Sequence, residues 1–268
     1  MQAHSATVVA NGTQLYYETA GDGPVVTLLH GFSLDHRMWD QQFAPFAHEF
    51  RVLRYDLRGF GRSGGVGEEP YSPADDLAAL LDHLGIASTA VIGLSMGGGC
   101  AIDFALAYPQ RTTALVAADS ALAGYEWSAG RPSAWHSELA ATLGVAAARQ
   151  AWLECSLFQP AAQKPEVAAA LRRLVDDYSG WHWLNENPLS APSGPAIEHL
   201  GEIACPSLIL VGERDTADFH IVADRLAEDI PDATLTRIPG AGHMSNMESP
   251  GEFNAAVLNF LRATASVR

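Results

Sequence analysis

Short apolar runs alternate with amphipathic segments along most of this chain, and this alternation restricts the fold more than any other feature. The runs are apolar on both faces, are bounded by Gly, Pro or Asp, and occupy residues 24–30, 50–56, 89–94, 113–119, 206–212 and 233–239. Helical segments that begin or end at Pro or Gly occupy residues 72–85, 97–109, 218–231 and 249–263. The alternation predicts an α/β fold with a mostly parallel sheet and helices on both faces.

Two segments depart from this alternation. Asn11-Gly12 separates two alternating runs and predicts a β-hairpin, which would give the sheet an antiparallel edge. Between residues 120 and 205 the chain is Ala-rich and helical in places, with no convincing strand, and it is too long for a simple loop. We therefore expect a core domain made of residues 1–119 and 206–268, with a helical cap insertion at 120–205.

Composition excludes several classes of protein. Of 268 residues, 48% are hydrophobic and 18% are charged, which is typical of a globular chain rather than a disordered one. No apolar run is long enough to span a bilayer, and the N-terminus lacks the pattern of a secretory signal. The formal net charge is −15, and Lys164 is the single lysine, so nucleic acid and anionic membranes are disfavoured as partners.

The cysteines indicate the compartment. Cys100, Cys155 and Cys205 are too few and too scattered for a disulfide framework, although the sequence allows a single disulfide bond between two of them. We expect them to be buried thiols of a cytoplasmic protein. The oligomeric state is not predicted.

The strongest chemical motif is G-x-S-x-G at residues 93–97, between a predicted strand and a predicted helix. A nucleophilic serine must stand clear of the sheet on a tight turn, and glycines on both sides of Ser95 make room for that turn. The helix that follows aims its N-terminal amides at developing negative charge. Ser95 is therefore the candidate nucleophile.

A nucleophilic serine needs a base and an acid that orients the base, in the chain order Ser, acid, His for this type of turn. Asp215 follows the strand at 206–212, and His243 lies in a Gly-rich loop after the next strand. Both positions fall at carboxyl ends of strands, where sites of open α/β sheets lie. Asp119 is the alternative acid, and Asp218, which we interpret as a helix cap, is the third choice.

The oxyanion of an acyl-transfer intermediate needs two backbone donors. One is expected from Met96, which follows the nucleophile, and the other from the loop after the first core strand. In that loop Gly31 lets the chain turn and brings the amide of Phe32 toward Ser95.

Two further patterns carry little weight. Residues 59–64 match G-x-G-x-x-G, but the loop does not lead directly into a helix as a dinucleotide site requires. No zinc-binding spacing of His or Cys is present, and His182 stands alone between two tryptophans. We therefore expect no cofactor and no metal.

In combination, HGF at 30–32, YDLRGFGRS at 55–63, GLSMGG at 93–98, GERD at 212–215 and GAGHMSNMESP at 240–250 resemble the α/β-hydrolase superfamily. The resemblance covers the chain outside 120–205. It implies the nucleophile Ser95, the acid Asp215, the base His243 and the oxyanion amides of Phe32 and Met96. Within the superfamily the chain is most similar to small bacterial enol-lactonases, carboxylesterases and cofactor-free perhydrolases. A serine nucleophile departs from epoxide hydrolases and haloalkane dehalogenases, which carry Asp there.

These observations predict a serine hydrolase that cleaves small carboxylic esters or lactones through an acyl-enzyme. A C–C hydrolase or a perhydrolase could use the same triad, and the superfamily resemblance also allows a ligand sensor. Five of six tryptophans fall in the expected cap, either filling its core or lining a cavity above Ser95. The cap also carries Arg131, Arg149, Arg172 and Arg173. If one of them faces a cavity, a substrate with its own carboxylate is expected; we expect all to face solvent, which favours neutral esters or lactones with an apolar acyl group.

Overall fold

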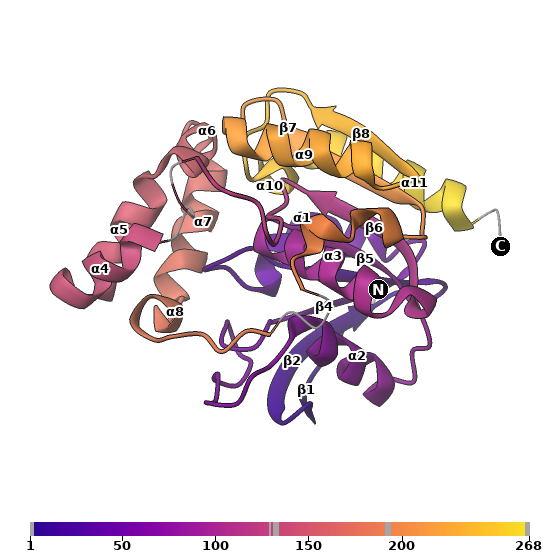
Figure 1. Cartoon of the computed structure of the whole chain (residues 1–268), viewed down its shortest axis with the longest axis horizontal. Coiled ribbons are helices and arrows are strands. Elements are labelled where there is room, and N and C mark those ends of the chain that lie inside the picture. The colour runs from indigo at the N-terminus through magenta and orange to yellow at the C-terminus, as the bar shows by residue number, and fades with distance from the viewer. Residues whose placement is uncertain (1–2, 129, 131–133, 191–193, 266–268) are drawn as a thin grey trace.

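We describe a computed structural model of the chain, covering residues 3–128, 130, 134–190 and 194–265. Eight strands form one sheet in the order β1-β2-β4-β3-β5-β6-β7-β8 (Figure 1). Their bounds are β1 His4–Ala10, β2 Thr13–Ala20, β3 Val25–Leu29, β4 Arg51–Tyr55, β5 Thr89–Leu94, β6 Thr112–Ala118, β7 Ser207–Gly212 and β8 Ala233–Ile238. This is the predicted α/β-hydrolase fold, with β3 to β8 parallel.

The antiparallel edge forms as the sequence predicts. β1 pairs with β2 through a two-residue turn in which Asn11 and Gly12 both have positive φ, at 47° and 73°. Only a residue that tolerates the left-handed region fits each position. β2 then pairs antiparallel with β4, which joins the hairpin to the parallel part of the sheet.

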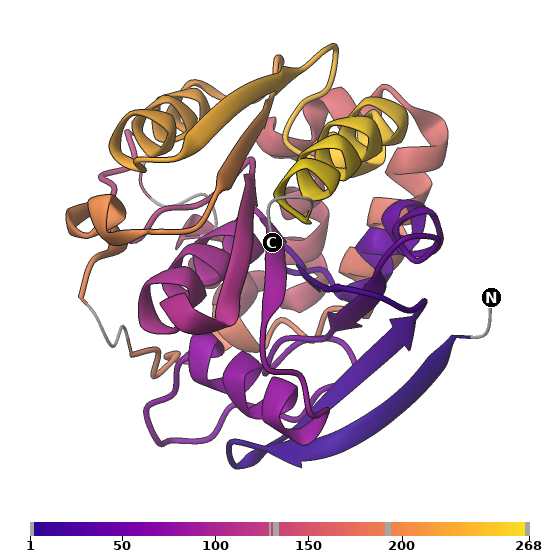
Figure 2. The same cartoon turned by 90° about the vertical axis from the view of Figure 1, so that its right-hand side faces the viewer.

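Helices cover both faces of the twisted sheet (Figure 2). On one face lie α2 (Pro73–His83), α3 (Met96–Ala107) and α9 (Ala217–Asp229), and on the other lie α1 (Asp40–Phe46) and α11 (Pro250–Ala265). Ser72 caps α2 by accepting a hydrogen bond from the Ala74 amide, and Pro73 occupies the first turn. Short elements complete this part of the fold: η1 His36–Trp39, η2 Pro109–Arg111 and α10 Ser245–Glu248.

Between β6 and β7 the chain forms a group of helices (Figure 1). Its elements are α4 Ala134–Leu143, α5 Val145–Glu154, η3 Ser156–Phe158, α6 Gln159–Ala162, α7 Pro165–Asp177, α8 Trp181–Leu184, η4 Ala196–Glu198 and η5 Leu200–Glu202. Of these, α4 to α8 lie beside the sheet, whereas η4 and η5 contact α3 and α9 of the core. Trp181 and Trp183 both lie on the short helix α8. Trp183 is buried and Trp181 is half-buried.

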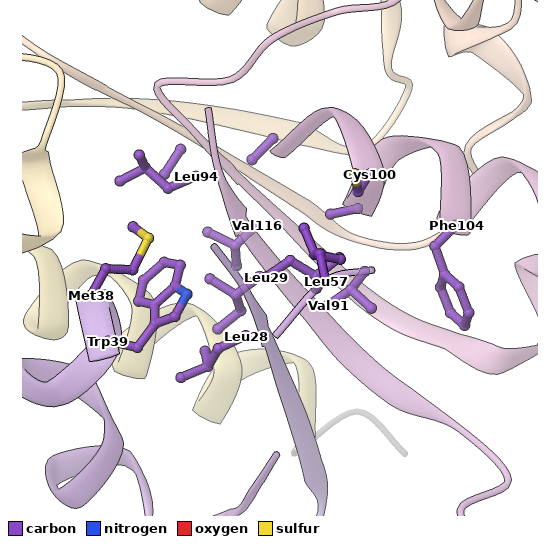
Figure 3. Packing of buried hydrophobic residues seen from close by; sticks show 14 of the residues in the cluster. Leu28, Leu29, Met38, Trp39, Leu57, Val91, Leu94, Cys100, Phe104 and Val116 are labelled. Atoms are coloured by element: carbon purple, nitrogen blue, oxygen red, sulfur yellow. The ribbon is translucent and has the colours of Figure 1, made fainter. Parts of the chain in front are cut away.

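The core lies on both sides of the central strands (Figure 3). β5 is buried along its whole length, and Trp39 and Phe104 are fully buried on helical elements that cover the sheet. Burial of side chains of this size is worth about 1.5–3 kcal/mol each. The carboxyl ends of the parallel strands are thereby held on a rigid base.

Two expectations from composition can be compared with the structure. Among the described residues, no helix is long and apolar enough to cross a membrane. The three cysteines are free thiols, with Cys100 and Cys205 buried and Cys155 half-buried.

Candidate active site

Ser95 lies on a strained turn between β5 and α3. Its φ of 58° and ψ of −118° fall in a region that residues other than glycine seldom adopt. The turn is possible because its neighbours lack side chains. A methyl group on Gly93 would meet the Gly97 carbonyl oxygen at 1.9 Å, and one on Gly97 would meet the Leu29 carbonyl oxygen at 2.2 Å. The half-buried serine thus stands at the carboxyl end of β5.

A continuous hydrogen-bonded chain links Ser95, His243 and Asp215. The Ser95 hydroxyl lies 3.0 Å from Nε2 of His243, and Nδ1 of His243 lies 2.9 Å from Oδ2 of Asp215. With its proton on Nδ1, the imidazole donates to the carboxylate and accepts from the hydroxyl. The other Asp215 oxygen, Oδ1, accepts a hydrogen bond from the Thr216 amide at 2.7 Å, which fixes the carboxylate.

The loop that carries His243 is held by Glu248. This buried carboxylate accepts hydrogen bonds from the amides of Gly242 at 2.9 Å and Met244 at 3.1 Å, the residues on both sides of the imidazole. The ammonium group of Lys164, from the segment before α7, donates to the backbone carbonyl of Glu248. The base is therefore anchored from α10 and from the helical group.

The two alternative acids have other surroundings. Asp119 is fully buried directly after β6, and it accepts hydrogen bonds from the Gly212 amide at 2.7 Å and from the Ser245 hydroxyl. Burial, reinforced by the charge of Asp215, raises the pKa of Asp119 well above its ordinary value. Asp218 lies in the first turn of α9, where its carboxylate accepts hydrogen bonds from the hydroxyls of Tyr125 and Ser128. Contrary to the sequence prediction, it does not cap the helix, and His243 is bonded to Asp215 instead.

The loop after β3 also lies next to Ser95. A methyl group added to Gly31 would contact Cβ of Ser95 at 3.6 Å, so the loop packs against the nucleophile. Phe32 follows Gly31, and Met96 begins α3. Both residues are half-buried, and they are the residues whose amides the sequence predicts as the oxyanion donors.

Aromatic rings surround this loop. The Phe32 ring makes edge or tilted contacts with five rings, at centroid distances of 5.6–6.0 Å: Phe60, Trp152, Tyr178, His182 and Trp183. Four of the five belong to α5, α8 and the segment between α7 and α8. On the side of the base, Phe219 packs against His243 at 4.3 Å and Trp127 packs against Phe219 at 4.9 Å.

The arginines of residues 120–205 have defined positions except Arg131, which lies outside the described residues. Arg149 is half-buried, and its guanidinium donates to the Tyr178 carbonyl, with Nε at 2.8 Å. Arg172 and Arg173 are exposed on α7, where Arg172 donates to Gln150.

Within the described part of the chain, two groups of side chains are close enough to hold a metal ion: Asp35, His36 and Asp56, and Asp119, Asp215 and His243. In the first group, His36 already bonds to Asp56 at 2.6 Å and Arg37 bonds to Asp35 at 2.9 Å. In the second, both ring nitrogens of His243 are engaged. The Gly-rich loop at 59–64 closes on itself through a hydrogen bond from the Gly59 amide to the Gly64 carbonyl, and α2 begins only at Pro73.

Several supporting residues were not predicted from the sequence. Glu248 and Ser245 lie within the GAGHMSNMESP motif, but nothing in its spacing says which backbone amides they contact. Ser33 has positive φ and accepts a hydrogen bond from the Trp152 indole, which joins residues far apart in the chain. A contact of that range leaves no local signal in a single sequence.

The fold and the hydrogen-bonded Ser-His-Asp chain define a class of protein, and comparison with known proteins names the family. The family model described as alpha/beta hydrolase fold matches residues 24–250. The chain therefore belongs to the alpha/beta hydrolase family, and it is a hydrolase.

Three similar proteins that match nearly the whole chain are named as hydrolases. The protein of Caulobacter sp. (strain K31) that is named carbamate hydrolase RutD is 29% identical over 266 residues, covering 94% of this chain and 97% of that protein. The enol-lactonase from Burkholderia xenovorans LB400 superposes with a TM-score of 0.82 at 28% identity, over 96% of this chain and 100% of the other. A thermophilic esterase from Thermogutta terrifontis gives a TM-score of 0.82 at 30% identity, over 98% and 99%.

Proposed function

We propose that this protein is a serine hydrolase that cleaves small carboxylic esters or lactones through an acyl-enzyme. The observation that carries the proposal is the chain of two hydrogen bonds from the Ser95 hydroxyl through His243 to Asp215, at 3.0 Å and 2.9 Å. These distances fall within the range expected of a nucleophile, its base and the acid that orients the base. The names of the esterase and enol-lactonase structures support the same reaction class.

In the proposed mechanism, Ser95 attacks the substrate carbonyl while Nε2 of His243 takes the hydroxyl proton. Asp215 keeps the imidazole in the correct tautomer and stabilises the imidazolium that forms. The amides of Phe32 and Met96 donate to the oxyanion of the tetrahedral intermediate. His243 then returns the proton to the leaving alkoxide, and a water molecule releases the acyl group by the same route.

The surroundings of Ser95 favour a neutral substrate with apolar groups. Aromatic rings lie on both sides of the triad, around Phe32 and around Phe219. Of the described arginines between residues 120 and 205, Arg149 is tied to a backbone carbonyl and the others are exposed. We therefore propose that residues 120–205 form a cap whose rings contact an uncharged acyl or lactone group.

Steady-state kinetics on a graded panel tests the proposal. The panel contains p-nitrophenyl esters of increasing acyl length, lactones of increasing ring and chain size, an aryl carbamate, and one ester that carries its own carboxylate. We expect the neutral esters or lactones to give the highest kcat/KM. Ser95→Ala should lower kcat by on the order of 10⁶ while the protein stays folded. Activity within tenfold of wild type in Ser95→Ala would contradict the assignment.

The same panel separates the alternatives that share this triad. Peracid formation from acetate and hydrogen peroxide that outruns ester hydrolysis would favour a perhydrolase. Cleavage of a vinylogous diketone but of no ester would favour a C–C hydrolase. A single slow acylation without repeated turnover would favour a ligand sensor.

A further inference from the structure

A second carboxyl group lies next to the candidate acid and is not used in the mechanism above. Asp119 follows β6, Asp215 follows β7, and these strands are neighbours in the sheet. One oxygen of Asp119, one oxygen of Asp215 and one ring nitrogen of His243 all lie within 4.8 Å of one another. Asp119 is fully buried and has a φ of 42°, which few side chains tolerate, so its placement is maintained at a cost in backbone strain.

The partners of Asp119 hold its carboxyl group in one orientation. Oδ1 accepts a hydrogen bond from the Gly212 amide at the end of β7, and Oδ2 contacts the Ser245 hydroxyl in the first turn of α10. The Asp119 amide donates to the Leu210 carbonyl at 2.8 Å. The titratable groups beside it are Asp215 and His243, and neither supplies a permanent positive charge.

Two buried carboxyl groups this close do not both ionise while His243 is neutral, because each charge opposes the other. Asp215, rather than Asp119, accepts the hydrogen bond from Nδ1 of His243. The shared proton then resides on Asp119, in agreement with the raised pKa of that group. Asp119 is thus neutral at rest.

We propose that Asp119 is a second acid for His243, which stays neutral while Asp215 is charged and ionises to orient the same imidazole when Asp215 is lost. In the intact protein Asp119 makes no hydrogen bond to the imidazole, whose Nδ1 is bonded to Asp215. The inference rests on the proposed function of the triad.

The proposal makes the effect of removing the Asp119 charge depend on Asp215. In wild type, Asp119→Asn replaces a neutral carboxyl group by a neutral amide that still accepts from Gly212, so kcat should change less than about threefold. Loss of a triad acid typically costs on the order of 10⁴ in kcat. We expect Asp215→Ala to lose only on the order of 10², because Asp119 takes over, and the double variant to reach the full loss on the order of 10⁴.

A double-mutant cycle on kcat for a neutral ester measures this dependence. The experiment compares wild type, Asp119→Asn, Asp215→Ala and the double variant, with Asp218→Asn as a control carboxylate that does not contact His243. Asp119→Asn should cost at least 30-fold more in the Asp215→Ala background than in wild type. An equal cost in both backgrounds would mean a merely structural role and would overturn the proposal.

Ser245→Ala provides a second test if Asp119→Asn fails to fold. It removes one hydrogen bond to Asp119 and should matter more in Asp215→Ala, where Asp119 is charged, than in wild type. Equal effects would again overturn the proposal. Loss of turnover in Ser95→Ala is measured separately, so failure of the triad assignment is distinguishable from failure of the second acid.

Discussion

The indole N–H of Trp152 donates a hydrogen bond to the Ser33 hydroxyl at 2.6 Å, and both groups are buried. Trp152 belongs to α5, and Ser33 follows Phe32 in the loop after β3. Ser33 has a φ of 62°, so the loop is held in a conformation that a side chain disfavours. The helical group therefore fixes the backbone from which the Phe32 amide would face the oxyanion.

Removing this hydrogen bond should lower kcat more than it raises KM. Trp152→Phe keeps an aromatic ring against Phe32 but loses the donor, and a hydrogen bond of this kind is worth about 1 kcal/mol. We expect kcat to fall roughly fivefold, because the loop relaxes away from the geometry that stabilises the intermediate. Steady-state kinetics measures both parameters, with Trp135→Phe at an exposed position as the control. Equal kcat values for the two variants would refute this prediction.

The backbone strain at Ser95 should be measurable as a difference in thermal stability between two variants of this residue. Glycine adopts positive φ without the steric cost of a side chain, whereas alanine retains that cost. We expect Ser95→Gly to be more stable than Ser95→Ala by about 1 kcal/mol, which corresponds to roughly 2–4 °C in Tm for a chain of this size. Calorimetry of the two inactive variants checks this, and a lower Tm for the glycine variant would be inconsistent with a strained turn.

Stability should decrease as the pH rises above neutrality because of His36. Burial opposes the charge on this side chain, but hydrogen bonds to Asp56 and Glu18 outweigh it and raise the pKa of His36 to about 9. An unfolded histidine titrates near ~6.5, so the stabilisation is complete below that pH and is lost as the pH rises through 9. The loss is on the order of 2–3 kcal/mol.

Urea unfolding of wild type and His36→Gln at pH 6, 7.5 and 9 isolates this contribution. Wild type should lose stability between pH 6 and 9 by that amount more than the variant does. Parallel dependence of the two proteins on pH would show that His36 is not charged in the folded state.

Glu248 should support catalysis by fixing the loop around His243. Glu248→Gln keeps the size of the side chain but offers only one oxygen to the amides of Gly242 and Met244. One amide is then left without an acceptor, which costs about 1–3 kcal/mol in stability. We expect kcat/KM to fall about tenfold as the imidazole loses its orientation. An equal effect of the exposed control Glu252→Gln would argue against this role.

The fold could be predicted because its signals are local. Apolar runs mark the buried parallel strands, and Pro73 marks the start of α2. Ser95, Asp215 and His243 could be predicted as candidates because each follows a strand, and parallel strands bring their carboxyl ends to one edge of the sheet. Chain order allows both Asp119 and Asp215, since both lie between Ser95 and His243. The resemblance of GERD at 212–215 favoured Asp215, and the hydrogen bond to His243 favours the same residue.

The helical segment between β6 and β7 shows what a single sequence does not determine. Trp181 and Trp183 are compatible with a strand or a helix, because a four-residue segment has too little periodicity to decide. The contacts of Phe32 with α5 and α8, like the Trp152–Ser33 hydrogen bond, join residues that are distant in the chain. Such contacts depend on how the helices pack against the core.

The central claim is that Ser95 is the nucleophile, and covalent labelling tests it most directly. The protein is incubated with a p-nitrophenyl alkylphosphonate, which traps a serine activated by its base, and peptide mass spectrometry then locates the adduct. The account predicts one adduct on Ser95 that forms in parallel with loss of esterase activity and is absent in Ser95→Ala. Loss of activity with the adduct on another residue, or full activity with Ser95 labelled, would contradict it.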